Sequence, residues 1–169
     1  NLYKKSIDLL NRIQKIKKNK TRTFTNKIYK LPVYDNKKLS SETKLFINWY
    51  AKKFLSKKKL QKLDILLNKQ IKFLLSSIRL KNNVFVHRDF HVSNLMKFKN
   101  QIALIDTQDA VIGNQAYDLA SLIDDVRFKS NKNFKDKVYE YYLKSNKCYF
   151  NKNYFLNDFE ILSVLRNMK

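Results

Sequence analysis

The chain has 169 residues, a formal net charge of +22 and a hydrophobic content of 44%. This length fits one domain or one lobe of a larger protein, and the apolar content excludes a disordered basic tail. Single Gly, Pro and Cys residues exclude a collagen-like chain, a disulfide framework, a cysteine-rich zinc module and a glycine-rich phosphate loop within these residues. No apolar run approaches the ~18 residues that span a membrane, so we expect no membrane span. The lone Cys148 is expected to be inert.

The positive charge is concentrated in the first half of the chain. Residues 1–83 carry 23 basic and 4 acidic side chains, whereas residues 84–169 carry 13 and 10. Such a basic half could steer an anionic ligand such as a nucleotide, or lie on RNA or anionic lipid. We favour a solvated lysine-rich surface, because no arginine cluster or basic-aromatic repeat is evident. No specific nucleic-acid partner is therefore expected.

Helical spacing of apolar residues predicts three helices in the first half. The chain opens in a helix whose repeat is Leu2, Leu9, Leu10, Ile13 and Ile16. Residues 17–38 are polar and are expected to form a long connection. A second helix over about residues 41–55, with Ser40 or Ser41 as N-cap, is expected to face a core through Leu45, Phe46, Trp49 and Tyr50. After a break at residues 57–59, a third helix has the repeat Leu60, Leu63, Leu66, Leu67, Ile71, Leu74, Leu75 and Ile78.

In the second half the pattern changes to short apolar runs. Residues 84–86, 94–98 and 102–105 predict three strands, and the turn at residues 99–101 predicts that the last two form a hairpin. Helical spacing returns at Ala116, where one face comprises Leu119, Leu122, Ile123 and Val126. Two further helices are expected near residues 134–143 and 156–168.

Polar side chains capable of chemistry follow the predicted strands. His87 to Asn94 come directly after the first strand, and Ile105 to Asp109 come directly after the hairpin. Because a hairpin returns the chain to where it started, we expect Asp89, Asn94 and Asp106 to lie within reach of one another. Their hard oxygen ligands suit Mg²⁺ rather than zinc. Phosphoryl transfer uses this set, with a carboxylate to accept the proton of the attacking hydroxyl.

The order H-R-D-x-x-x-x-N, followed after a hairpin by an Asp, is the catalytic-loop pattern of kinases. The stretch from Val86 to Asp125 resembles the C-terminal lobe of the aminoglycoside phosphotransferase and choline kinase superfamily. The residues of its motifs are most similar to those of the bacterial kinases that phosphorylate the anomeric hydroxyl of N-acetylmuramate and N-acetylglucosamine in cell-wall recycling. The segments that carry this resemblance are residues 86–91, 94–96, 105–106, 108–110, 117–122, 31–35, Glu42, Leu45-Phe46 and Trp49-Tyr50.

The resemblance implies an α+β, mostly α-helical fold: a protein-kinase-like C-terminal lobe in which a short β-hairpin carries the catalytic and metal loops. It implies a cytoplasmic enzyme that uses ATP and Mg²⁺ on a small-molecule substrate; the sequence carries no signal of an oligomeric state. Asp89 would be the catalytic base, and Asn94 and Asp106 the magnesium ligands. His87 and Asp118 would support the catalytic loop, while His91, Gln108 and Asp109 are candidates for contact with substrate or phosphate. Trp49 and Tyr50 could stack on a sugar, although core packing is the favoured interpretation.

The chain departs from the family pattern at several points. Some relatives have Gly where Arg88 stands, and an aromatic residue is more usual at Thr107. D-F-G and A-P-E motifs are absent, which argues against a protein kinase. With no glycine-rich loop and no assignable phosphate-binding lysine, residues 1–169 are expected to be the C-terminal lobe alone. The N-terminal nucleotide-binding lobe would precede Asn1, and residues 1–169 alone would be inactive.

Two alternatives stay open. The acceptor could be another small molecule, such as an aminoglycoside or a choline-like amino alcohol, because such kinases share the catalytic loop. The chain could instead be a non-catalytic basic module that binds nucleic acid or anionic membrane, with an affinity that falls steeply with salt. A degenerate kinase is less favoured because Asp89, Asn94 and Asp106 are intact.

Overall fold

A computed structural model describes residues 2–128, 130–146 and 150–169, and Cys148 lies outside them. The fold is α+β and mostly helical, as expected. Its α-helices are α1 (Leu2–Ile13), α2 (Asn36–Leu45), α3 (Lys52–Phe54), α4 (Lys57–Ser76), α5 (Ala116–Ile123), α6 (Lys132–Ser145) and α7 (Lys152–Asn167). A π-helix, η1 (Phe46–Ala51), links α2 to α3, and η2 (Val92–Asn94) is a 3₁₀ turn. None of the described helices is both long and apolar enough to cross a membrane.

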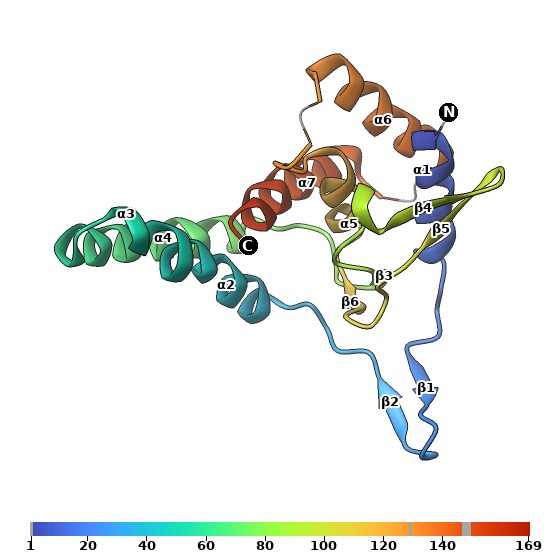
Figure 1. The fold of residues 1–169 in the computed structure, drawn as a ribbon, viewed down its shortest axis with the longest axis horizontal. Coiled ribbons are helices and arrows are strands. Elements are labelled where there is room, and N and C mark those ends of the chain that lie inside the picture. Colours follow the sequence, from blue (N-terminus) through green and yellow to red (C-terminus); the bar gives the residue numbers. More distant parts are fainter. Residues whose placement is uncertain (1, 129, 147–149) are drawn as a thin grey trace.

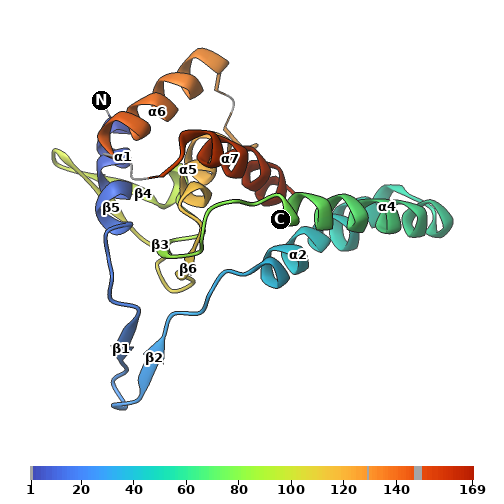
Figure 2. The ribbon, with the colours of Figure 1, turned by 180° about the vertical axis from the view of Figure 1, so that it is seen from behind.

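The body of the molecule surrounds α5, whose eight residues are all buried. This helix packs mainly against α7, and also against α6 and α1 (Figures 1 and 2). Leu119 and Leu162 are fully buried here, as is Ile7, an inward residue of α1 that the expected repeat omitted. Val126, by contrast, lies beyond the end of α5 and is 69% exposed, so its assignment to the apolar face was wrong.

Three two-stranded antiparallel sheets complete the fold. The predicted hairpin is present, because β4 (Leu95–Phe98) pairs with β5 (Gln101–Leu104). The first expected strand, β3 (Val84–Val86), pairs with β6 (Val111–Gly113), which the sequence did not indicate. A Cβ atom at Gly113 would lie 3.0 Å from Val86 Cγ2, so a larger residue there would require Val86 to shift slightly. The third sheet, β1 (Lys20–Arg22) with β2 (Ile28–Lys30), is exposed at every residue.

Residues 36–76, which we call the arm, project from the body in both views (Figures 1 and 2). The segments α2, η1 and α3 run outward, and α4 returns alongside them. Contacts of α2 and α4 with α7 hold the arm to the body. Beyond α4, the buried carboxylate of Asp158 accepts hydrogen bonds from the backbone N–H groups of Arg79 and Leu80, each at 2.8 Å.

The boundaries of the arm differ from the expectation. The segment 17–38 contains the β1–β2 hairpin, and α2 begins at Asn36, before either expected N-cap. Asp35 is the N-cap, because its carboxylate accepts a hydrogen bond from Lys38 N–H at 2.9 Å. Lys57 to Lys59 form the first turn of α4, so the expected break does not lie there. The break between α3 and α4 comes just before, at Leu55 and Ser56, whose backbones are extended.

The arm also buries less than its apolar spacing indicates. Trp49 and Tyr50 are 70% and 59% exposed, so the favoured interpretation of core packing was wrong for both. Leu66 is exposed as well, and Ile71 and Leu75 are the buried residues of α4. Helical spacing marks an apolar face, but burial also needs a packing partner, and the main contacts of the arm with the body are those of α2 and α4 with α7.

Candidate active site

Two loops meet at the open end of the β4–β5 hairpin, and we call residues 87–94 and 105–109 the loop junction. The Asn94 side-chain amide donates to the Asp89 carbonyl oxygen at 3.0 Å, and its Nδ2 lies 3.5 Å from Asp106 Oδ2. The Ile105 N–H donates in turn to the Asn94 carbonyl oxygen at 3.1 Å. The structure therefore places the Asn94 side chain between the Asp89 backbone and the Asp106 carboxylate.

The His87 side chain links the two loops. Its Nε2 lies 3.0 Å from the Ile105 carbonyl oxygen, which can only accept, so Nε2 carries the proton. The ring is fully buried, and burial lowers the pKa of His87. The His87 ring therefore links the loop that contains Asp89 to Ile105, the residue before Asp106.

Asp118 holds the same loop through the backbone. Its carboxylate is fully buried in α5 and accepts hydrogen bonds from His87 N–H at 2.7 Å and Arg88 N–H at 3.0 Å. Burial raises the pKa of Asp118 to about 7, although the two N–H donors act in the opposite direction. Asp118 thus contacts the backbone of the loop that it is expected to support, just before Asp89.

Arg88 adopts a backbone conformation that favours glycine, with φ at 75°. The side chain offsets this strain by an ion pair of 2.6 Å with Glu42 of α2, and both side chains are mostly buried. Glu42 also accepts a hydrogen bond of 2.6 Å from the Tyr34 hydroxyl. The resemblance implies that some relatives have Gly at position 88, and the positive φ provides a physical reason for it. Sequence reasoning missed the role of Glu42, which is 46 residues away.

The three further candidates of the loop junction lie in different environments. His91 is only 7% exposed, which leaves little surface for a ligand, and burial, Arg127 and Arg166 lower its pKa. Gln108 donates from its side chain to Asp106. Asp109 accepts from Arg88 Nη1 through its carbonyl oxygen at 3.4 Å, so it helps to order the loop.

A hollow of about 290 Å³ opens beside Asp89, and sequence reasoning missed its charged residues. Asp125, Arg127, Arg166 and Lys169 line it, and Lys169 Nζ lies 3.6 Å from Asp89 Oδ1. Burial would raise the pKa of Asp125, but hydrogen bonds from Arg127 prevail and lower it to about 2. The signal that could have found Asp125 and Arg127 is their position just after the Tyr117–Leu122 motif, whereas Arg166 and Lys169 lie at the end of α7, far away in sequence.

The donor set at the loop junction suits a hard divalent cation. Asp106 offers carboxylate oxygens and Asn94 an amide oxygen, the ligand types that Mg²⁺ prefers. Among the described residues there is no group of three His, Cys, Asp or Glu side chains placed to hold a metal. Magnesium in phosphoryl transfer is held by one or two protein carboxylates and the phosphates of the nucleotide.

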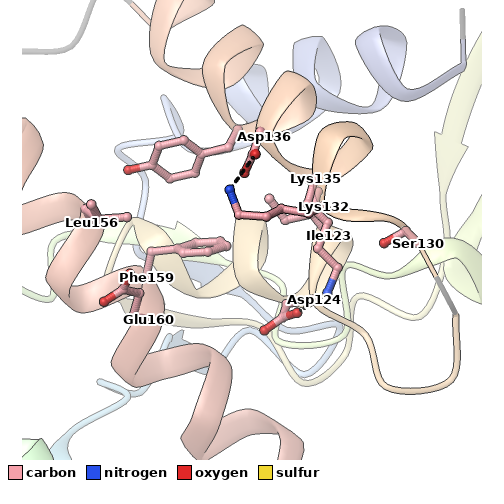
Figure 3. Close-up of a pocket in the computed structure, with 10 residues that line it drawn as sticks. Ile123, Asp124, Ser130, Lys132, Lys135, Asp136, Leu156, Phe159 and Glu160 are labelled. Atoms are coloured by element: carbon pink, nitrogen blue, oxygen red, sulfur yellow. Dashed lines mark hydrogen bonds and ion pairs between the residues drawn. The ribbon is translucent and has the colours of Figure 1, made fainter.

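A separate hollow of about 480 Å³ lies among α5, α6 and α7, remote from the loop junction. Figure 3 shows Phe159 of α7 and Lys132 of α6 pointing toward one another across it. Its lysines are paired: Lys132 with Asp136 at 3.1 Å, and Lys135 with Asp124. None of the candidate residues from the sequence lines this hollow, so volume alone does not identify the site.

The chain matches the phosphotransferase enzyme family over residues 1–150. It belongs to that family. The loop junction, with its contacts among Asp89, Asn94 and Asp106 and the hydrogen bonds of Asp118 to the loop backbone, therefore belongs to a member of a phosphotransferase family.

Three bacterial proteins with the name N-acetylmuramate/N-acetylglucosamine kinase are similar to the chain. The protein of Neisseria meningitidis serogroup B is 34% identical over 116 residues, which are 68% of this chain and 35% of that protein. The protein of Pseudomonas aeruginosa is 36% identical over 96 residues, 56% of this chain and 28% of that protein. The protein of Caulobacter vibrioides is 27% identical over 136 residues, 75% of this chain and 36% of that protein. The chain thus spans about a third of the length of these curated relatives.

Proposed function

We propose that the protein carrying this chain is a kinase that transfers the γ-phosphoryl group of ATP to a hydroxyl of an amino sugar. The acceptor is N-acetylmuramate or N-acetylglucosamine, and the hydroxyl is the anomeric one, as in cell-wall recycling in the cytoplasm. The observation that carries the proposal is the Asn94 side chain, which bonds the Asp89 backbone and approaches the Asp106 carboxylate. Family membership and the names of the relatives support the reaction and the acceptor.

In this proposal Asp89 is the general base. Its carboxylate accepts the proton of the acceptor hydroxyl as that oxygen attacks phosphorus, and the side chain orients the hydroxyl for in-line transfer. The loop must position this carboxylate, and the hydrogen bonds of Asp118, His87 and Asn94 hold the backbone of the loop that carries it. Catalysis of phosphoryl transfer depends mainly on such positioning and on electrostatic stabilisation.

Asn94 and Asp106 are proposed to hold Mg²⁺ at this end of the hairpin. The ion, when bound with the nucleotide, neutralises charge on the phosphates. Residues 1–169 form the C-terminal lobe in this proposal. The parts that cover the phosphates belong to an N-terminal lobe outside these residues, so this chain alone would turn over little or nothing.

Substitution of Asp89 tests the proposal in the complete protein that carries this chain. Asp89→Asn keeps the size of the side chain and removes its capacity to accept a proton. We expect kcat to fall by about 10² to 10⁴, the usual loss for a missing general base, with a much smaller change in KM. Asp136→Asn on the exposed face of α6 is the matched control and should keep full activity. Nearly full activity of Asp89→Asn would refute the role of Asp89.

A further inference from the structure

The groove that lies between the arm and the body has an aromatic wall. It has a volume of about 700 Å³ and is lined by Phe46, Trp49 and Tyr50 of η1, opposite Val126 and Met168. The Phe46 and Tyr50 rings stack with centroids 5.4 Å apart, and Trp49 is 70% exposed. A π-helix is rare and is frequently found at functional sites. Here it places three aromatic residues within one short segment, and an exposed aromatic face of this kind suits the apolar face of a sugar ring.

This aromatic groove reaches the proposed base. It shares Val126, Asn167 and Lys169 with the smaller hollow that is lined by Asp89 and Arg127. The two hollows are therefore one continuous surface that has the aromatic wall at one end and the Asp89 carboxylate at the other. A sugar that lies on the wall would thus share one surface with the group that is proposed to take its proton.

The charged end of the surface is built to meet an anion. Asp125, whose side chain is 7% exposed, accepts from Arg127 Nε at 2.8 Å and from Nη2 at 2.6 Å. These two bonds fix the guanidinium plane, while Nη1 bonds none of the described residues and the side chain remains 57% exposed. Arg166 and Lys169 add two further cations to the lining, against the carboxylates of Asp89 and Asp125. The three cations of this lining outnumber the two carboxylates with which they pair, so a cationic acceptor would meet a net positive charge, whereas a carboxylate could accept a hydrogen bond from Arg127 Nη1.

We infer that this surface is the acceptor site, in which Trp49 stacks on the ring of an N-acetylated amino sugar and Arg127 binds a carboxylate substituent of that sugar. The inference rests on the proposed function and adds to it the two residues that recognise the acceptor. It disfavours aminoglycosides and amino alcohols, because their charge has the wrong sign for this lining.

Binding and turnover by the complete protein, measured side by side, test this inference. The probes are N-acetylmuramate, which carries a carboxylate, and N-acetylglucosamine, which does not. Arg127→Gln should weaken binding of N-acetylmuramate by roughly ten-fold, the usual effect of one hydrogen bond to a charged group, and change N-acetylglucosamine by less than about two-fold. Trp49→Ala should weaken both sugars by a few-fold. Sugar binding should change the fluorescence of Trp49, and Trp49→Phe should reduce the change in tryptophan fluorescence that is seen with the unsubstituted protein.

The matched controls are Arg22→Gln on β1 and Phe73→Ala on α4, both exposed and outside the surface, and they should bind both sugars as the unsubstituted protein does. Equal losses for the two sugars in Arg127→Gln, or unchanged binding in Trp49→Ala, would overturn the inference. Failure of the unsubstituted protein to bind either sugar would also overturn it. Sugar binding with these variant effects but without phosphoryl transfer from ATP would support the acceptor site and refute the proposed function.

Discussion

The body and the arm differ in how they use their apolar residues. All eight residues of α5 are buried in the body, whereas Ile71 and Leu75 are the buried residues among the twenty of α4. The proposed base and metal ligands lie at the edge of the body, where buried side chains fix their loops. The aromatic wall lies on the arm, where the side chains remain accessible. The comparison suggests that the reaction chemistry is placed on the rigid part and the recognition of the acceptor on the open part.

Truncation of one apolar residue from each region should give the largest contrast. Leu119→Ala removes a fully buried side chain from α5 and should lower the free energy of unfolding by about 2 to 5 kcal/mol. Ile65→Ala removes a side chain of α4 that is 71% exposed and should change it by less than about 0.5 kcal/mol. Denaturant unfolding of the complete protein measures both. Similar losses for the two variants would show that the arm is packed against a surface in the complete protein.

The pH dependence of stability should report the burial of Asp118. Its pKa is about 7 in the folded protein against 3.8 as the ordinary value, so between these pH values the folded state holds a proton that the unfolded state has released. Stability contributed through this group therefore falls as pH rises across that window, by at most about 1.4 kcal/mol per pH unit. Asp118→Asn removes the titrating group. The difference between the free energies of unfolding at pH 5 and pH 7.5 should therefore be smaller in this variant than in the unsubstituted protein. An unchanged pH dependence would contradict this account.

Residue 88 offers a smaller, matched test of the loop junction. Arg88→Ala and Arg88→Gly both remove the ion pair with Glu42, but only glycine adopts a φ of 75° without strain. We expect Arg88→Gly to be more stable than Arg88→Ala by roughly 1 kcal/mol in denaturant unfolding. Equal stabilities would show that the backbone at this position relaxes once the side chain is removed.

The loop junction was predictable because its residues are close in sequence. Asp89, Asn94 and Asp106 follow a strand and a hairpin, and antiparallel pairing alone brings the ends of the hairpin together. The partners that hold the junction were harder to find. Glu42 reaches Arg88 across 46 residues, and no local pattern records such a contact.

The parts that sequence reasoning missed lack a strong pattern or depend on a distant partner. Strands β1 and β2 are exposed on both faces, so their sequences show no alternation. Strand β6 has three residues and is recognisable only by its pairing with β3. Trp49 has the spacing of a core residue, but whether such a residue is buried depends on a packing partner that periodicity does not identify.

Calorimetric titration of MgATP into the complete protein tests the proposed convergence of Asn94 and Asp106 on a metal most directly. The account predicts that the unsubstituted protein binds the nucleotide with Mg²⁺ and that Asp106→Ala loses the magnesium-dependent part of this binding. Asp136→Ala, which removes an exposed carboxylate on α6 outside the loop junction, should retain it. Unchanged magnesium-dependent binding in Asp106→Ala would contradict the assignment of Asp106 as a ligand and, with it, the proposed phosphotransferase site.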